Sequence, residues 1–246
     1  MSTTTVDPMI AETSSSKPSK AQTDYANGTN GTVPPLNNGD RLTRAEFERR
    51  YNLRPDIQKA ELIEGVVYVA SPVSPRHAIR HGDVMAWIGF YRSATPDVWV
   101  ADNVSLRLDL DNDPQPDACV WLDDRVIGEI EEGQFLEVEP SFIIEVASSS
   151  AAYDLHDKKH AYRRNGIQEY LVLLAHEKEC RWFVWEAGEY VELKPNEQGI
   201  YQSRVLPGLW LDCAQFWAGN LFAVLQVLQQ GLDSPEHQAF ALNCHR

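Results

Sequence analysis

The chain has 246 residues, of which 43% are hydrophobic and 24% charged, and its formal net charge is −14. These proportions are typical of a globular protein with one sizeable domain. The acidic balance argues against a protein that coats nucleic acid through its overall field. No apolar run approaches the ~20 residues that a membrane helix needs, so we expect no membrane association. The N-terminus lacks a basic start followed by an apolar stretch, which predicts a cytoplasmic protein.

The cysteines are scattered along the chain, at Cys119, Cys180, Cys213 and Cys244. They form no Cys-x-x-Cys pair, and spaced histidine pairs do not accompany them. This pattern favours reduced structural thiols over a disulfide framework or a cysteine zinc site.

Composition divides the chain into three parts. Residues 1–39 are rich in Ser, Thr, Asn, Gly and Pro and show no apolar periodicity. Such a stretch cannot bury enough apolar surface to offset its ordering entropy, so we expect a disordered N-terminal arm. We expect a globular domain over residues 40–231 and a polar C-terminal tail over residues 232–246.

The first elements of the predicted domain are a helix, a hairpin and a longer helix. Residues 43–47 look like a short capped helix. Residues 61–70 are rich in valine around a Glu-Gly turn at 64–65, which predicts two short strands. A Ser-Pro pair then starts a helix over residues 74–92, with Ser as N-cap and Pro at the first helical position.

Strands dominate the remainder of the predicted domain, with two further helices. We expect a helix that Gly166 ends and a last helix that Gly231 ends. The succession predicts an α/β fold with one mixed β-sheet and helices against it. The expected strands lie within residues 98–108, 117–122, 137–147, 169–174, 180–185 and 190–193, and the helices over 155–165 and 221–230.

Two carboxylates occupy unusual places in this pattern. Asp117 opens one predicted strand, and Glu145 lies within the strongly apolar stretch 142–147. A carboxylate in such a strand is costly to bury unless it is paired, protonated or bound to a metal. Two carboxylates that meet at strand ends form a hard oxygen site suited to Mg²⁺ or Mn²⁺. The pattern alone is explained equally well by an ion pair between Glu145 and an arginine at a strand edge.

Phosphodiester hydrolysis also needs a positive charge near the attacking water or the phosphate. The predicted helix after Glu145 is basic, and Asp154 and Lys158 share one of its faces because they are four residues apart. From the charge pattern alone, a solvated helix with a stabilising ion pair is the favoured interpretation. The basic residues of this helix are Lys158, Lys159, Arg163 and Arg164.

One histidine, His77, falls in the first turn of the helix predicted from residue 74. A histidine there can contact a phosphate or act as a base, but a position on the helix surface is the favoured interpretation. The sequence has no phosphate-binding glycine loop and no nucleophile elbow, so no other constellation competes with the carboxylates.

Several short motifs follow one another at characteristic distances, and together they resemble the Uma2 family of endonucleases. The resemblance covers roughly residues 45–190. That family belongs to the PD-(D/E)xK group, so the resemblance implies a restriction-endonuclease-like fold, with a mixed sheet flanked by helices. The motifs are Glu61-Leu62-Ile63-Glu64-Gly65, Ser74-Pro75-Arg76-His77, Gln115-Pro116-Asp117, Ile144-Glu145-Val146, Asp154 with Lys158, and Tyr162 through Gly166 to Glu169-Tyr170.

The resemblance also implies an active site. It makes Asp117 and Glu145 the ligands of Mg²⁺ or Mn²⁺ and Glu61 an additional acid. Lys158 would be the catalytic lysine.

This chain departs from the wider group at the lysine. The usual lysine stands two residues after the glutamate, on the same strand face because side chains alternate. Here Ala147 occupies that position, so a lysine from the following helix would have to reach the site. The sequence leaves open whether Lys158 or its neighbour Lys159 does so.

Our first hypothesis is therefore a metal-dependent endonuclease that hydrolyses phosphodiester bonds in nucleic acid, with DNA as the expected substrate. A catalytically inactive binding or interaction module on the same fold is the alternative that the acidic charge and Ala147 allow. A metal phosphohydrolase acting on small substrates is a third, weaker interpretation. Whether the protein works as a homodimer stays open.

Overall fold

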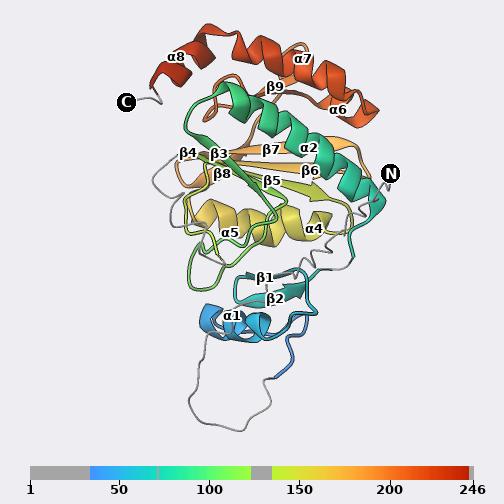
Figure 1. Ribbon diagram of the computed structural model, residues 1–246, viewed down its shortest axis with the longest axis vertical. Coiled ribbons are helices and arrows are strands. Elements are labelled where there is room, and N and C mark those ends of the chain that lie inside the picture. The colour runs from blue at the N-terminus through green and yellow to red at the C-terminus, as the bar shows by residue number, and fades with distance from the viewer. Residues whose placement is uncertain (1–33, 71, 123–134, 244–246) are drawn as a thin grey trace, which may run out of the picture. The chain divides into compact units, whose positions relative to one another are not determined.

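Six strands form the central sheet of the computed structural model, which describes residues 34–70, 72–122 and 135–243. Their order across the sheet is β3-β4-β5-β6-β7-β8 (Figure 1). Strands β5 and β6 run parallel, and the other neighbouring pairs are antiparallel. The strands are β3 (Val98–Asp102), β4 (Ala118–Leu122), β5 (Phe142–Ala147), β6 (Glu169–Leu174), β7 (Glu179–Glu186) and β8 (Glu189–Glu192).

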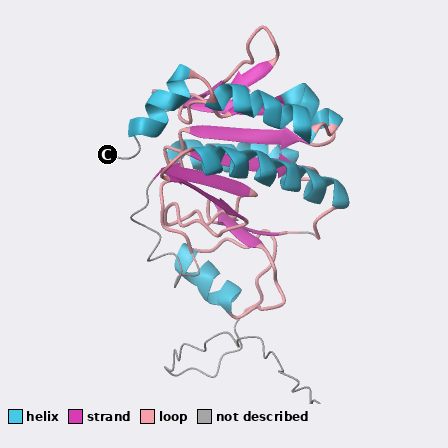
Figure 2. Cartoon of the chain, turned by 45° about the horizontal axis from the view of Figure 1, so that its top comes forward, coloured by secondary structure: helices cyan, strands magenta, loops and turns pink. Residues whose placement is uncertain are grey.

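Helices cover both faces of this sheet (Figures 1 and 2). Alternation along β5 explains the layers, because successive side chains point to opposite faces. Phe142 and Ile144 join a buried cluster with Trp87 of α2, whereas Ile143 joins a second cluster with Tyr162 of α5. On the first face lie α2 (Pro75–Ala94), α6 (Cys213–Ala218) and α7 (Leu221–Leu232). On the second face lie α4 (Ala151–Tyr153), the π-helical turn η1 (Asp154–Lys158) and α5 (Lys159–Arg164). The predicted mixed sheet flanked by helices is confirmed.

The N-terminal elements form a smaller cluster of their own. They are α1 (Arg44–Asn52), β1 (Ala60–Ile63) and β2 (Val66–Val69). The predicted hairpin is confirmed, and its turn residues Glu64 and Gly65 both have positive φ, 50° and 72°, as tight hairpin turns require. Of the expected N-terminal arm, residues 1–33 lie outside the described residues. Its last residues pack against the hairpin: Leu36 is buried, and the Gly39 amide donates to the Val67 carbonyl over 2.8 Å.

The long helix α2 begins where its sequence predicts. Ser74 caps it, because its hydroxyl accepts from the His77 amide at 3.3 Å, and Pro75 occupies the first turn. Its buried side turns Trp87 and Tyr91 toward the sheet. None of the helices in the described part of the chain combines the length and apolar character needed to cross a membrane.

The C-terminal third differs most from the prediction. The last predicted helix does not end at Gly231, because α7 continues to Leu232. Gly231 serves packing instead: a Cβ there would lie 2.2 Å from the Gly208 carbonyl oxygen. The expected polar tail contains a helix whose His237 is buried. The elements that the sequence did not indicate are β9 (Ile200–Gln202), β10 (Trp210–Asp212), α6 and α8 (Pro235–Asn243).

The expectation of reduced thiols was wrong for two cysteines. Cys180 on β7 and Cys213 at the start of α6 form a disulfide across a separation of 33 residues. No sequence pattern marks the pair, because only the packing of α6 beside β7 brings the two residues together. Cys119 is a free, buried thiol, and Cys244 lies outside the described residues.

Candidate active site

Two neighbouring strands bring Asp117 and Glu145 together. In the antiparallel pairing of β4 and β5, Ala118 lies opposite Ile144. One step further along, alternation places Asp117 and Glu145 side by side on the face that α5 covers. Both carboxylates are buried. The convergence that the sequence indicated is therefore a consequence of strand register.

Glu145 is held from the helical side. Its Oε1 accepts hydrogen bonds from Lys158 Nζ at 2.8 Å and from the Tyr162 hydroxyl at 3.0 Å. Burial raises the pKa of Glu145 to about 8; the Lys158 ammonium opposes this shift, whereas the Asp117 carboxylate adds to it. The alternative of an arginine partner at a strand edge was wrong, because β5 is a central strand and the partner is a lysine.

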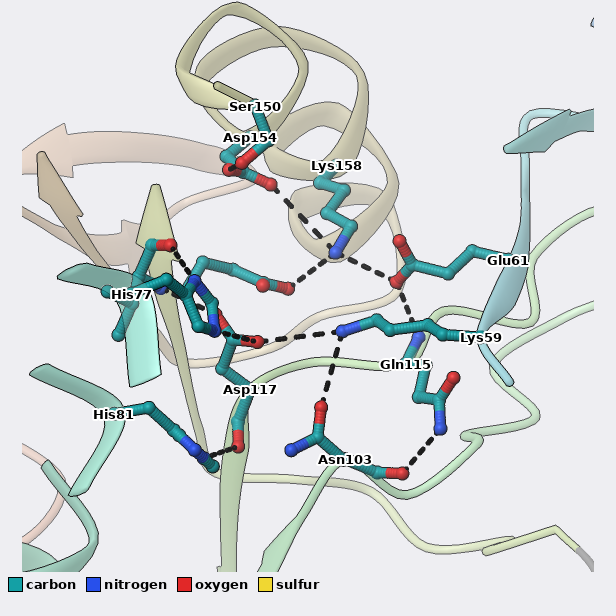
Figure 3. Close-up of polar contacts among 12 residues, drawn as sticks. Lys59, Glu61, His77, His81, Asn103, Gln115, Asp117, Ser150, Asp154 and Lys158 are labelled. Carbon is teal, nitrogen blue, oxygen red and sulfur yellow. Dashed lines mark hydrogen bonds and ion pairs between the residues drawn. The ribbon is translucent and has the colours of Figure 1, made fainter. Parts of the chain in front are cut away.

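Lys158 bridges carboxylates from three different elements (Figure 3). Its Nζ lies 2.8 Å from Oε1 of Glu145 on β5, 2.8 Å from Oε1 of Glu61 on β1 and 3.9 Å from Oδ1 of Asp154 on η1. Burial alone would lower the pKa of Lys158, but these carboxylates raise it well above its ordinary value. Lys159 points elsewhere, with its Nζ 3.8 Å above the ring of Phe183.

A π-helical turn presents Lys158 to the site. Such turns are rare and occur mostly as single turns inserted in α-helices, frequently at functional sites. The turn begins at Asp154, whose carboxylate accepts from the Ser150 hydroxyl at 2.6 Å and whose carbonyl accepts from the Tyr170 hydroxyl at 2.9 Å. These bonds hold Asp154 beneath the sheet face, on the same side of the turn as Lys158.

Asp117 is surrounded by positive and donor groups. Its Oδ2 accepts from the Val146 amide at 2.8 Å, and its Oδ1 lies 3.4 Å from His77 Nε2 and 3.5 Å from Lys59 Nζ. Burial would raise the pKa of Asp117, but His77 and Lys59 lower it well below its usual range. The hydrogen bond with Asp117 raises the pKa of His77 in turn.

The favoured interpretation of His77 as a surface histidine was therefore wrong. Its Nδ1 lies 2.8 Å from the carbonyl oxygen of Val146, so this nitrogen carries the proton and donates. One turn further along α2, His81 Nε2 lies 2.9 Å from the Asp117 carbonyl oxygen. Through these contacts with backbone carbonyl groups, the two histidines hold α2 against the strand ends that carry the carboxylates.

Three residues at this site were given no role by the sequence analysis, although Gln115 belongs to one of its motifs. Lys59 stands two residues before Glu61, so strand alternation could have placed both on one face. Asn103 accepts from Lys59 Nζ at 3.4 Å through its side chain and from Gln115 Nε2 at 2.6 Å through its carbonyl. The backbone amide of Gln115 donates to Glu61 Oε1 at 2.6 Å. Loop residues such as Asn103 and Gln115 have no periodicity that would reveal them.

The profile of the Uma2 family, described as a putative restriction endonuclease, matches residues 44–214 of the chain. The chain belongs to the Uma2 family. The predicted resemblance is thereby confirmed, and every side chain of the site lies within the matched span.

A solved structure supports the fold. The chain is similar to the crystal structure of a putative nuclease belonging to DUF820 from Anabaena variabilis, with 13% sequence identity and a TM-score of 0.56. The match covers 69% of this chain and 96% of that one. The nuclease-like α/β fold is therefore confirmed. Among curated proteins, none matches the chain.

In the PD-(D/E)xK group that the sequence resembles, a strand lysine follows the glutamate by two residues; this chain has Ala147 there, and the lysine beside Glu145 comes from η1. Ala147, at the usual lysine position, is buried in the apolar cluster that also contains Tyr162 and Tyr170. A lysine there would enter this cluster, whereas Lys158 approaches Glu145 from the helix that covers the strand. The structure thus gives a steric reason for the departure.

Asp117 and Glu145 offer hard oxygen ligands of the type that suits a divalent cation. In the described ranges, no three His, Cys, Asp or Glu side chains converge as a ready metal site. Magnesium needs no such set, because one or two carboxylates commonly bind it together with waters and substrate phosphates. Among the described residues, both hydrogen bonds to Glu145 fall on Oε1, so Oε2 would be the oxygen that binds a metal beside Asp117.

Proposed function

We propose that this Uma2 protein is a metal-dependent endonuclease that hydrolyses phosphodiester bonds in nucleic acid, with DNA as its substrate. One observation carries the proposal: Asp117 and Glu145 are buried side by side at the ends of two neighbouring strands, with Lys158 on Glu145 at 2.8 Å. This arrangement offers hard oxygen ligands and a fixed positive charge at one point, as phosphoryl chemistry requires.

Each residue has a role in this proposal. Asp117 and Glu145 would hold Mg²⁺ or Mn²⁺, which supplies an acidified water and neutralises charge that develops on the phosphate. Lys158 keeps Glu145 and Glu61 in fixed positions and can orient the attacking water with its ammonium group. Glu61 is an additional acid, held by the Gln115 amide.

The charge balance supports a bound cation. Four acidic side chains of the site face Lys59, Lys158 and His77, and burial raises the pKa of Glu145 to about 8, so its charged form lacks full compensation. A buried excess of negative charge is unfavourable unless a cation compensates it, and a divalent ion would do so. The buried acids are Glu61, Asp117, Glu145 and Asp154.

Calorimetric titration of Mn²⁺ into the purified protein tests the metal site. We expect binding in the parent and its loss in Glu145→Gln, which keeps the shape of the side chain but removes the charge. Glu197→Gln is the matched control, because Glu197 is exposed and lies on the loop between β8 and β9. Equal binding by the parent and Glu145→Gln would refute the assignment of the ligand.

Cleavage of supercoiled plasmid DNA tests the activity. With Mg²⁺ or Mn²⁺ present, we expect the parent to nick or linearise the plasmid and Asp117→Asn to leave it intact, with an unchanged circular dichroism spectrum. An Asp117→Asn protein that cleaves as well as the parent would refute the proposal. A parent that retains DNA with or without metal but never cleaves it would instead identify a binding module.

A further inference from the structure

The lysine that bridges the carboxylates is poorly placed to touch a substrate. The Lys158 side chain is only 3% exposed, and Glu61 and Glu145 each lie 2.8 Å from its ammonium group. To reach a phosphate on a polymer, it would have to leave two buried carboxylates without their partner. Breaking a buried ion pair in this way is strongly unfavourable, so Lys158 keeps its contacts with the carboxylates inside the site.

Lys59 offers the opposite combination. Its side chain is 23% exposed, and among the described residues its Nζ makes only long contacts, 3.5 Å to Asp117 Oδ1 and 3.4 Å to Asn103 Oδ1. Figure 3 shows Lys59 reaching toward Asp117 from a different direction than Lys158 reaches its carboxylates. A lysine with long contacts and access to solvent can exchange them for a phosphate at little cost.

Asp117 does not depend on Lys59 alone. Its other oxygen keeps the 2.8 Å bond from the Val146 amide, and His77 remains 3.4 Å from Oδ1. Asp117 would therefore still have partners if the Lys59 ammonium moved away. The loss of this contact would also remove one positive charge from beside Asp117 Oδ1.

We propose that Lys59 binds the phosphate of the nucleic-acid backbone at this site, a contact that rests on the proposed function. With a net charge of −14, the overall field of the protein repels nucleic acid, so binding depends on local cations beside the carboxylates. Lys59 supplies this charge at the rim of the site, while Lys158 positions the acids inside it.

Salt dependence of binding tests this contact without requiring cleavage. The probe is a short fluorescent DNA duplex, titrated with protein in Ca²⁺ at several NaCl concentrations and followed by anisotropy. The slope of log K against log salt is negative, and each lost phosphate contact reduces its magnitude by about one. We expect this change in Lys59→Gln and recovery of the parent slope in Lys59→Arg, which keeps the charge.

Lys194→Gln is the matched control, because Lys194 is an exposed lysine beside Glu192 and should leave the slope unchanged. Equal slopes for the parent and Lys59→Gln overturn the inference, even if the parent cleaves DNA. A parent that fails to bind the duplex overturns it as well. A Lys59-dependent slope in a parent that never cleaves supports the phosphate contact and refutes only the nuclease activity.

Discussion

Replacing Lys158 with methionine removes the only ammonium group that contacts Glu145 among the described residues. The side chains of Glu145 and Glu61 are 4% and 8% exposed, so solvent cannot replace the lost charge. Removal of one partner from a buried ion pair costs about 3–5 kcal/mol. For a domain of this size, each kcal/mol shifts the Tm by about 2–4 °C, so we expect the Tm of Lys158→Met to fall by roughly 6–20 °C.

Thermal unfolding followed by circular dichroism, with EDTA present, measures this fall. Lys159→Met is the matched control, because its ammonium lies 3.8 Å over the centroid of the Phe183 ring and an interaction of this kind contributes ~1 kcal/mol. The double variant Lys158→Met, Glu145→Gln should recover part of the loss, since it removes one of the uncompensated charges. A Tm for Lys158→Met within about 2 °C of the parent would refute the reasoning.

Four further outcomes are expected elsewhere in the molecule. Burial beside Glu48 raises the pKa of Asp113 to about 8, so the folded state keeps a proton that the unfolded chain loses above about pH 4. The free energy of unfolding therefore falls as the pH rises toward 8. Asp113→Asn should reduce the difference between the Tm values at pH 6 and pH 8. Gly231→Ala should destabilise by about 1–3 kcal/mol in urea unfolding, because its Cβ would lie 2.2 Å from a carbonyl oxygen. Gly89→Ala, in an open position of α2, should stabilise by about 0.5–1 kcal/mol, and the opposite signs would contradict the packing. Reduction of the disulfide that closes 33 residues should cost about 3–4 kcal/mol, so an unchanged Tm in dithiothreitol would contradict a stabilising role.

Local signals predicted the central part of the fold well. The Ser-Pro start of α2 and the Glu-Gly turn of the first hairpin are decided by neighbouring residues, so sequence reasoning could find them. The C-terminal elements are different. The interior position of Gly231 depends on the approach of a distant backbone segment, and the disulfide depends on the packing of α6 beside β7. Neither leaves a periodic trace in the sequence.

The residues of the candidate site likewise include some that local sequence signals indicate and others whose positions depend on distant packing. Glu145 could be recognised because a charge in an apolar strand demands a partner, and strand alternation explains its position beside Asp117. The environment of His77 could not be read, because it depends on how α2 crosses the strand ends. Lys59 was missed although it shares a strand face with Glu61, since a lysine at the start of a strand is usually solvated.

The π-helical turn at Asp154–Lys158 makes the site sensitive to the length of the chain as well as to its chemistry. A π-turn holds one residue more than an α-turn, so deletion of a single residue there would restore regular α-helical spacing. The π-turn takes up its extra residue within one turn, so the flanking helices would keep nearly the same relative orientation and the change would be confined to the turn. Asp154 and Lys158 would then be three residues apart and still share a face, but the backbone of Lys158 would shift relative to the two strands whose carboxylates it bridges. The number of residues in this turn therefore sets how far the Lys158 ammonium reaches, with every carboxylate of the site unchanged.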